Sequence, residues 1–182
     1  ASGPNVAGGG LAAPKRASAA GGTSTVRPVR ISRTGNKVKI GIRMNAQGTE
    51  SGAGFTVKVD PAVLSSPSNI TLGENAVGAT LTVNSADAAA GRLGVILDLP
   101  PTDTWAAGDI ELLTLEFDVA AGPVTSTTVE FENAPVANEV VDAAADTLTA
   151  SFESGDISLL GPTSAPVSIS GIVTDANGRL VV

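Results

Sequence analysis

Apolar and polar residues alternate one by one along several stretches of this chain, and no other feature limits its fold as strongly. The stretch KVKIGIRM (37–44) places its apolar side chains at every second position: Val38, Ile40, Ile42 and Met44. The same period returns in GFTVKVD (54–60), ELLTLEFDVA (111–120) and TTVEFEN (127–133). A period of two predicts β-strands with one buried face, and no segment shows the 3.6-residue period of a helix. The chain is therefore expected to be all-β.

The spacing of these strands predicts an antiparallel β-sandwich. About nine strands follow one another at intervals of about 8–15 residues, separated by Gly, Pro, Asn and Asp, as in sandwich domains. In TVRPVRIS (25–32), Val29 and Ile31 are expected to share the buried face. The three residues Gly52–Gly54 are interpreted as a turn or bulge, and Ala88–Ala90 as no more than a helical turn.

Two segments outside the sandwich differ from it in composition. Residues 1–24 are rich in Gly, Ala, Ser and Pro, and they bury too little to offset an ordering cost of about 1–2 kcal/mol per residue. Residues 161–182 begin with a linker and continue as an alternating strand with a hairpin signal at Asn177-Gly178. An isolated hairpin is only marginally stable. We predict an extended arm (1–24), a sandwich (25–160) and a linker with an orphan strand or hairpin (161–182).

The side-chain inventory excludes most enzyme classes. Cysteine and histidine are both absent, which removes thiol chemistry, the commonest general base and the usual zinc ligands. No nucleophile elbow and no phosphate-binding glycine loop occur. The sequence contains no run of 18 apolar residues, so no membrane-spanning helix is predicted. A calculated pI near 4.4 argues against nucleic acid as the partner. The sequence predicts a protein that is not an enzyme.

Carboxylate pairs are the remaining candidates for chemistry. The pairs are Asp98 with Asp103, Asp142 with Asp146, and Glu130 with Glu132. The last pair shares one strand face, and a solvated face is the simpler interpretation. The loops 100–109 and 140–146 could supply some calcium ligands, but calcium needs six to eight oxygens and no EF-hand pattern is present. We therefore expect no catalytic residues and no cofactor, with calcium as the open alternative.

Charge is segregated along the chain. The first 43 residues hold eight basic side chains and no acidic one, whereas the remainder holds three basic side chains and all 18 acidic ones. The basic head of one copy could attract the acidic body of the next, because opposed charges steer encounter. A terminal segment could then pair with an exposed strand edge of its neighbour. Alternatively, the tail is the last strand of its own sandwich and the arm lies on its own surface.

Residues 37–159 resemble the cohesin-type β-sandwich modules of bacterial extracellular proteins. The motifs that carry this resemblance follow in the same order: VKIGIRM, FTVKVDPAVLSSPSNITLG, GRLGVILDLPP and ELLTLEFDVA. The resemblance implies a non-catalytic, extracellular jelly roll, and cellulosomal members of that family bind dockerins. The final SISGIVTDANGRLVV is similar to the first strand and turn of a carboxypeptidase-regulatory-like (transthyretin-like) module, which breaks off here after one hairpin.

The sequence offers candidate positions both for glycan binding and for glycosylation. All four Phe side chains are expected to point inward, which leaves Trp105 in a loop, where a lone Trp caps the end of a sandwich more often than it binds sugar. Asn69-Ile70-Thr71 is an N-glycosylation sequon, and Thr163 and Ser164 could carry O-glycans in what is otherwise an ordinary linker.

These observations lead to two hypotheses. The first is a structural subunit of a pilus-like surface filament, a homopolymer that grows head to tail by strand addition through the ends of the chain. The alternative is a cohesin-like recognition module of a surface protein that binds a protein or a glycan. Both place the chain outside the cell or at its surface. The first assigns the subunit interface to Val6, Leu11, Lys15, Arg16, Val167, Ile169, Ile172 and Val173.

Overall fold

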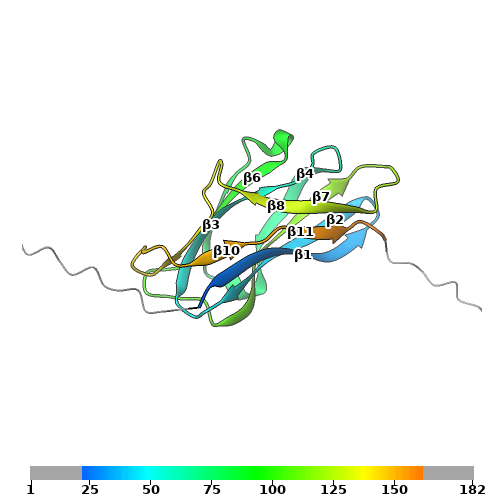
Figure 1. Cartoon of the computed structure of the whole chain (residues 1–182). Helices are drawn as coiled ribbons and strands as arrows, with labels where there is room; N and C mark the ends of the chain where they lie inside the picture. The colour runs from blue at the N-terminus through cyan, green and yellow to red at the C-terminus, as the bar shows by residue number, and fades with distance from the viewer. Residues whose placement is uncertain (1–21, 162–182) are drawn as a thin grey trace, which may run out of the picture.

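The computed structural model describes residues 22–161 and shows two β-sheets packed face to face (Figure 1). The first sheet has the strand order β10-β1-β2-β7-β4 and the second has the order β11-β8-β3-β6-β5, with β9 also paired to β3. The strands are β1 (Ser24–Thr34), β2 (Lys37–Ala46), β3 (Glu50–Lys58), β4 (Leu64–Leu72), β5 (Thr80–Asn84), β6 (Arg92–Asp98), β7 (Gly108–Val119), β8 (Ser126–Glu132), β9 (Glu139–Asp142), β10 (Ala150–Phe152) and β11 (Gly155–Ser158).

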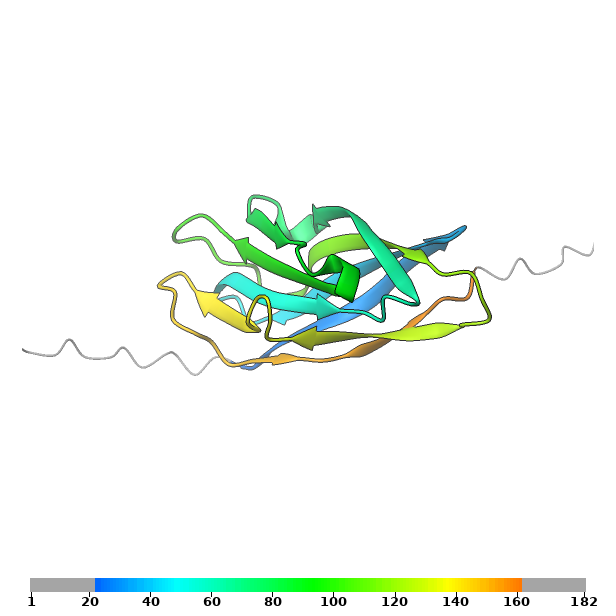
Figure 2. The ribbon, with the colours of Figure 1, turned by 90° about the horizontal axis from the view of Figure 1, so that it is seen from above.

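Almost every strand pairing in these residues is antiparallel, and the predicted all-β sandwich is confirmed. The exception is β1, which pairs in parallel with β10 from Ser24↔Ala150 to Val26↔Phe152. Seen from above, the two sheets form an elongated body, and the start of β1 and the end of β11 lie toward opposite ends of it (Figure 2). Residues 22–161 contain two single 3₁₀ turns, Glu74–Ala76 and Ala88–Ala90, so the alanine run Ala88–Ala90 forms one helical turn, as expected.

The core lies between the sheets and is filled by the residues that the alternation marked as inward. Val38, Ile40, Ile42 and Met44 of β2 are each 0% exposed. Phe55 of β3 is fully buried and contacts the ring of Phe131 edge to face, with centroids 5.7 Å apart. Aliphatic side chains make up most of the remaining core. Each strand therefore buries one face against the opposite sheet.

The predicted inward row of β1 was wrong. The buried residues are Ser24, Val26 and Pro28, whereas Ile31 is 44% exposed. Val29 pairs with Gly41, an outward position of β2, and Ile31 lies against the same glycine. A register shift between Arg30 and Ser32 then ends the regular ladder. The missing side chain of Gly41 thus makes room for an apolar contact on the outer surface.

The glycines between residues 52 and 54 lie inside β3, not in a turn. A register shift against β9 does separate Glu50 from Gly52, so the bulge part of the prediction was correct. Gly54 is in the regular part of the strand and pairs with Ile96. Glycine inside a strand often marks a close approach of another segment. Other segments of the chain cover the outer side of both Gly52 and Gly54.

One carboxylate is fully buried at the end of the sandwich where the described chain begins. Glu50 is 0% exposed and accepts hydrogen bonds from the hydroxyl of Ser24 and from the backbone N–H groups of Gln47 (2.6 Å), Gly48 (2.9 Å) and Thr49 (3.0 Å). Its carbonyl accepts the backbone N–H of Trp105 at 2.8 Å. Glu50 therefore ties the start of β1 and the 47–49 turn to the loop before β7.

Within the described residues, no helix is long and apolar enough to cross a membrane.

Candidate binding face

The outer face of the second sheet carries the main group of polar and charged residues that could meet a partner. Outward positions alternate with the core residues on each strand. They include Thr80, Thr82 and Asn84 on β5, Ile96 and Asp98 on β6, and Thr128 and Glu130 on β8. Ile96 is an exposed large apolar side chain at 38%. We call this surface the outer face of the second sheet.

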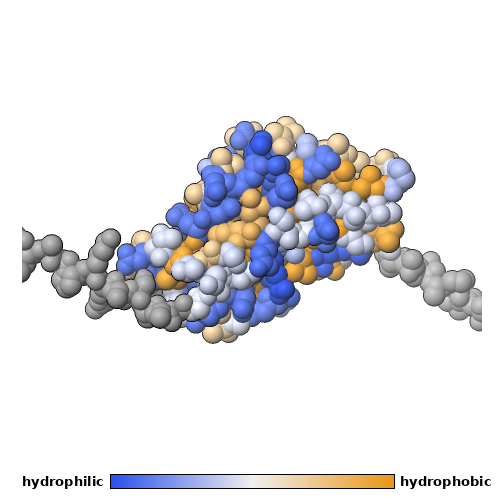
Figure 3. All heavy atoms as spheres, viewed as in Figure 1, coloured by the Kyte–Doolittle hydropathy of each residue, from blue (hydrophilic) through white to orange (hydrophobic). Residues whose placement is uncertain are grey.

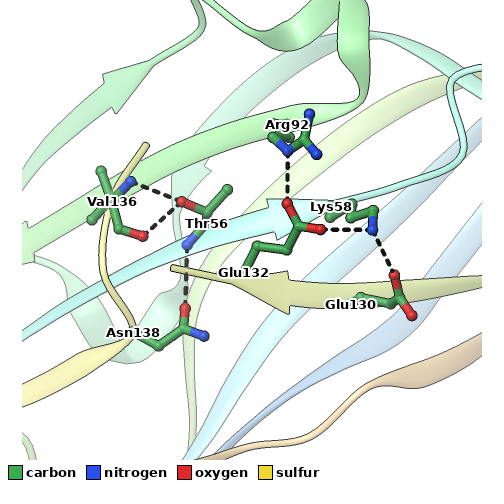
Figure 4. A network of polar contacts seen from close by, with 7 residues as sticks. All are labelled: Thr56, Lys58, Arg92, Glu130, Glu132, Val136 and Asn138. Carbon is green, nitrogen blue, oxygen red and sulfur yellow. Dashed lines mark hydrogen bonds and ion pairs between the residues drawn. The ribbon is translucent and has the colours of Figure 1, made fainter. Parts of the chain in front are cut away.

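One end of this face carries a network of four charged side chains (Figure 4). The Nζ of Lys58 lies 2.6 Å from Oε1 of Glu132 and 3.3 Å from Oε2 of Glu130. The Nε of Arg92 donates to Oε2 of Glu132 at 2.6 Å. The four residues come from β3, β6 and β8, so the cross-strand pairing Arg92↔Lys58↔Glu130 brings them together.

The network shifts the titration of its members. Hydrogen bonds first from Lys58 and then from Arg92 lower the pKa of Glu132. The same contacts raise the pKa of Lys58, with Glu132 as the larger cause and Glu130 as the smaller. Lys58 and Glu132 therefore stay charged through the neutral range, and the ion pairs hold the four side chains next to one another on the surface.

The chain between β8 and β9 covers the middle of this face. Residues 133–138, here named the ridge loop, leave the edge of β3 after β8 and return to it at β9. The hydroxyl of Thr56 donates to the carbonyl of Val136 at 2.7 Å and accepts the N–H of Val136 at 2.9 Å. The side-chain oxygen of Asn138 accepts the backbone N–H of Thr56 at 3.4 Å. Figure 4 shows these contacts beside the charged network.

Two glycines make room for the ridge loop. A Cβ on Gly94 would lie 2.7 Å from Val136 Cγ2 and 3.1 Å from Pro135 Cγ. A Cβ on Gly54 would lie 3.2 Å from the carbonyl oxygen of Ala137 and 3.3 Å from Val136 Cγ1. The loop therefore rests directly on the backbone of β3 and β6, and this explains why Thr56 is 0% exposed on an outward position.

The charges of the first sheet pair with one another. Lys37 of β2 lies 3.0 Å from Asp118 and 3.3 Å from Glu116, both on β7. Asp109 of β7 lies 3.2 Å from Arg27 and 3.3 Å from Arg43. The basic head and the acidic body thus meet inside one domain, because β2 pairs with β7. Three basic residues of the head, Arg27, Lys37 and Arg43, therefore pair with acidic residues of the same chain.

The other basic residues of β1 contact the end of the described chain. Arg30 donates to the carbonyl of Leu160 at 2.9 Å, and Arg33 donates to the carbonyl of Leu159. Leu160 and Val124 are exposed here and line a shallow hollow of about 340 Å³ with Arg33. Figure 3 shows apolar residues at this end of the view and others near its centre, among hydrophilic residues.

The predicted site residues fall into two groups. Asn69 lies on β4, is exposed, and donates to Glu116 at 3.2 Å. The two O-glycan candidates, Thr163 and Ser164, lie outside the described residues, and so do all predicted interface residues. Those assignments therefore stay predictions. The interface residues are Val6, Leu11, Lys15, Arg16, Val167, Ile169, Ile172 and Val173. Trp105 is 2% exposed and closes one end of the sandwich, as expected, so its ring is not open to sugar.

The carboxylate pairs take structural positions. Asp142 accepts the N–H groups of Ala144 and Asp146, each at 2.9 Å, and so closes the turn that follows β9. Glu130 and Glu132 belong to the charged network. Among residues 22–161, no three acidic side chains come close enough together to hold a metal ion.

Sequence reasoning did not find the ridge loop. The segment NAPVAN (133–138) reads as a turn-rich connection between strands. The available signal was Gly54 and Gly94, two glycines at outward positions within strands, which indicate that another segment packs on the backbone. That signal does not identify the segment, because the contact between β6 and the ridge loop joins residues about 40 positions apart.

Comparisons with known proteins address the fold directly. No protein-family model matches the sequence, and no curated protein matches it significantly. Solved structures do match. A type I cohesin from Pseudobacteroides cellulosolvens is 13% identical over 82% of this chain and 98% of its own, with a TM-score of 0.60. The described domain has the fold of a cohesin module.

Two further cohesins have the same architecture. A cohesin of scaffoldin B from Acetivibrio cellulolyticus, solved in complex with a Cel5 dockerin, is 16% identical, covers 74% of this chain and 97% of its own, and has a TM-score of 0.59. A non-cellulosomal cohesin from the archaeon Archaeoglobus fulgidus is 10% identical, covers 75% and 91%, and has a TM-score of 0.58. The predicted resemblance of residues 37–159 to cohesin modules is thereby confirmed at the level of the fold.

The prediction of a homopolymer was wrong. In the Acetivibrio cellulolyticus complex and in a complex from Clostridium thermocellum, the partner of the cohesin is a dockerin and not a second copy of the cohesin. The charge pattern that favoured self-assembly is used inside the domain, on β2 and β7. The head-to-tail filament loses its main support.

Proposed function

We propose that this domain is a non-catalytic recognition module that binds another protein through the outer face of the second sheet. The observation that carries the proposal is the composition of this outer face. On the second sheet, an exposed Ile96 lies among small polar side chains, with fixed charges at one end. Interfaces combine an apolar centre with a polar rim in this way.

The cohesin fold supports a protein as the ligand. The similar cohesin of Acetivibrio cellulolyticus was solved with a dockerin bound. A folded partner of this kind suits a broad strand face better than a small molecule does, since small ligands need deep pockets. We further infer that the module acts at the cell surface, the location that the resemblance implies.

Binding of purified dockerin modules tests the proposal. The full chain is titrated by calorimetry against a panel of dockerins from cellulosomal bacteria, and at least one is expected to bind with micromolar affinity or tighter. Thr82→Arg, on the outer face of β5, is expected to weaken that binding at least tenfold by steric exclusion. Thr34→Arg serves as the matched control, because Thr34 is also exposed but lies at the end of β1 in the other sheet.

Two results would count against the proposal. If no dockerin in the panel binds the unaltered chain, recognition of this partner class is excluded. If Thr34→Arg weakens binding as much as Thr82→Arg does, the partner does not use the outer face of the second sheet.

A further inference from the structure

The ridge loop changes what kind of surface can dock on this face. Outward positions of β3 and β6 at its centre are Gly54, Thr56 and Gly94, and the loop hides them all. A partner cannot lie flat on the strands there. It meets Pro135 and Ala137, which are exposed, with Val136 packed beneath.

The ridge loop is a built element. Thr56 holds Val136 by two hydrogen bonds, Asn138 receives the N–H of Thr56, and Asn133 accepts the N–H of Asn138 at 3.0 Å. The two bonds to Val136 satisfy the hydroxyl of Thr56, the only polar side chain among the three strand positions that the loop hides. Loops held this firmly present the same shape to every partner, so binding pays little ordering entropy for them.

Two acidic side chains beside the ridge loop, Asp98 and Glu139, lie outside the charged network. Asp98 pairs with Gly52 and Glu139 pairs with Gly54, so the two carboxylates flank β3 from either side. Neither forms an ion pair with a basic side chain of residues 22–161. The charged network of Lys58 and Arg92, by contrast, is neutralised by its own glutamates.

We propose that the ridge loop is the specificity determinant of this face, and that it selects a folded protein module with an apolar recess for Pro135 and Ala137 and with basic side chains opposite Asp98 and Glu139. This inference rests on the proposed function. It adds the shape and charge of the partner. The ridge loop would fit into a recess of the partner at the centre of the interface, and the acidic side chains of this chain would face basic side chains of the partner at the rim. Electrostatic complementarity of this kind excludes partners with an acidic rim.

Variants of the loop and of its rim test this inference, with a dockerin that binds the unaltered chain as the probe. Ala137→Arg adds bulk and positive charge to the exposed ridge and is expected to weaken binding at least tenfold. Ala121→Arg, in the exposed loop between β7 and β8, is the matched control and should stay within twofold. Asp98→Lys should weaken binding at least threefold at low salt and reduce its salt dependence.

The outcomes separate the two proposals. If the unaltered chain binds no dockerin, the proposed function fails and this inference falls with it. If binding is present but Ala137→Arg and Asp98→Lys both remain within twofold, the face is used and the ridge loop does not select the partner. Thermal unfolding of each variant shows whether it is folded; should Ala137→Arg unfold, Asp98→Lys alone decides.

Discussion

Replacing Glu50 by alanine is expected to lower the free energy of unfolding by about 4 kcal/mol, the largest loss from any single polar side chain of the described domain. The change removes the acceptor of four hydrogen bonds and leaves three backbone N–H groups and the Ser24 hydroxyl without it. Each buried donor left unsatisfied costs about 1–3 kcal/mol. Urea unfolding followed by circular dichroism measures the loss.

Ser24→Ala provides the control for this prediction. It removes one donor to the same carboxylate and keeps the three backbone contacts, so we expect a loss of about 1 kcal/mol. Equal losses for the two variants would show that the backbone contacts of the 47–49 turn contribute nothing.

The contribution of Glu50 is also expected to depend on pH. Burial alone would raise the pKa of Glu50, but the hydrogen bonds from Ser24 and from the backbone of residues 47 and 49 outweigh it and lower the pKa below the ordinary 4.5. A carboxylate with a depressed pKa stabilises the fold fully above the unfolded-state pKa, and its stabilisation is lost as the pH falls through the folded-state pKa. The stability gap between the native chain and Glu50→Gln should therefore be constant from pH 7 to 5.5 and shrink below about pH 4.5. A gap that widened on acidification would contradict this.

Replacing Phe55 by alanine is expected to cost about 4 kcal/mol. Phe55 is fully buried on β3, between the two sheets, and its ring contacts Phe131 at 5.7 Å and Phe152 at 6.4 Å between centroids. Loss of a buried Phe combines the lost transfer energy with the cost of a cavity, typically about 3–5 kcal/mol. Phe55→Leu keeps most of the volume and should lose about 1–2 kcal/mol. Equal losses for the two variants in urea unfolding would exclude a cavity cost.

Alternation predicted the strands well because most of them bury one face in a single core. On β7 the inward row Leu113, Leu115, Phe117 and Val119 is buried as expected, opposite the outward Glu116 and Asp118. On β1 it failed. Pro28 took an inward position, and Ile31 packed on Gly41 of the outer surface, a contact that depends on a neighbouring strand.

Charge composition could not identify which charges pair. The sequence places the basic residues in the first 43 positions, but it does not state that β2 lies beside β7. Lys37 and Asp118 are 81 positions apart and become neighbours only through the sheet order. The charge split along the sequence therefore favoured a contact between two copies, whereas the sheet order brings these charges together within one copy.

The two ends of the described domain lie at opposite poles, and β1 runs parallel to its neighbour β10. A pull applied through the flanking chain would draw β1 toward one pole and β11 toward the other. The hydrogen bonds of β1 would then bear the load side by side and would have to rupture together, and the Arg30 and Arg33 bonds to the last carbonyls would share it. A pull along the chain would therefore load the hydrogen bonds of β1 in shear, the geometry in which a sheet resists mechanical unfolding best.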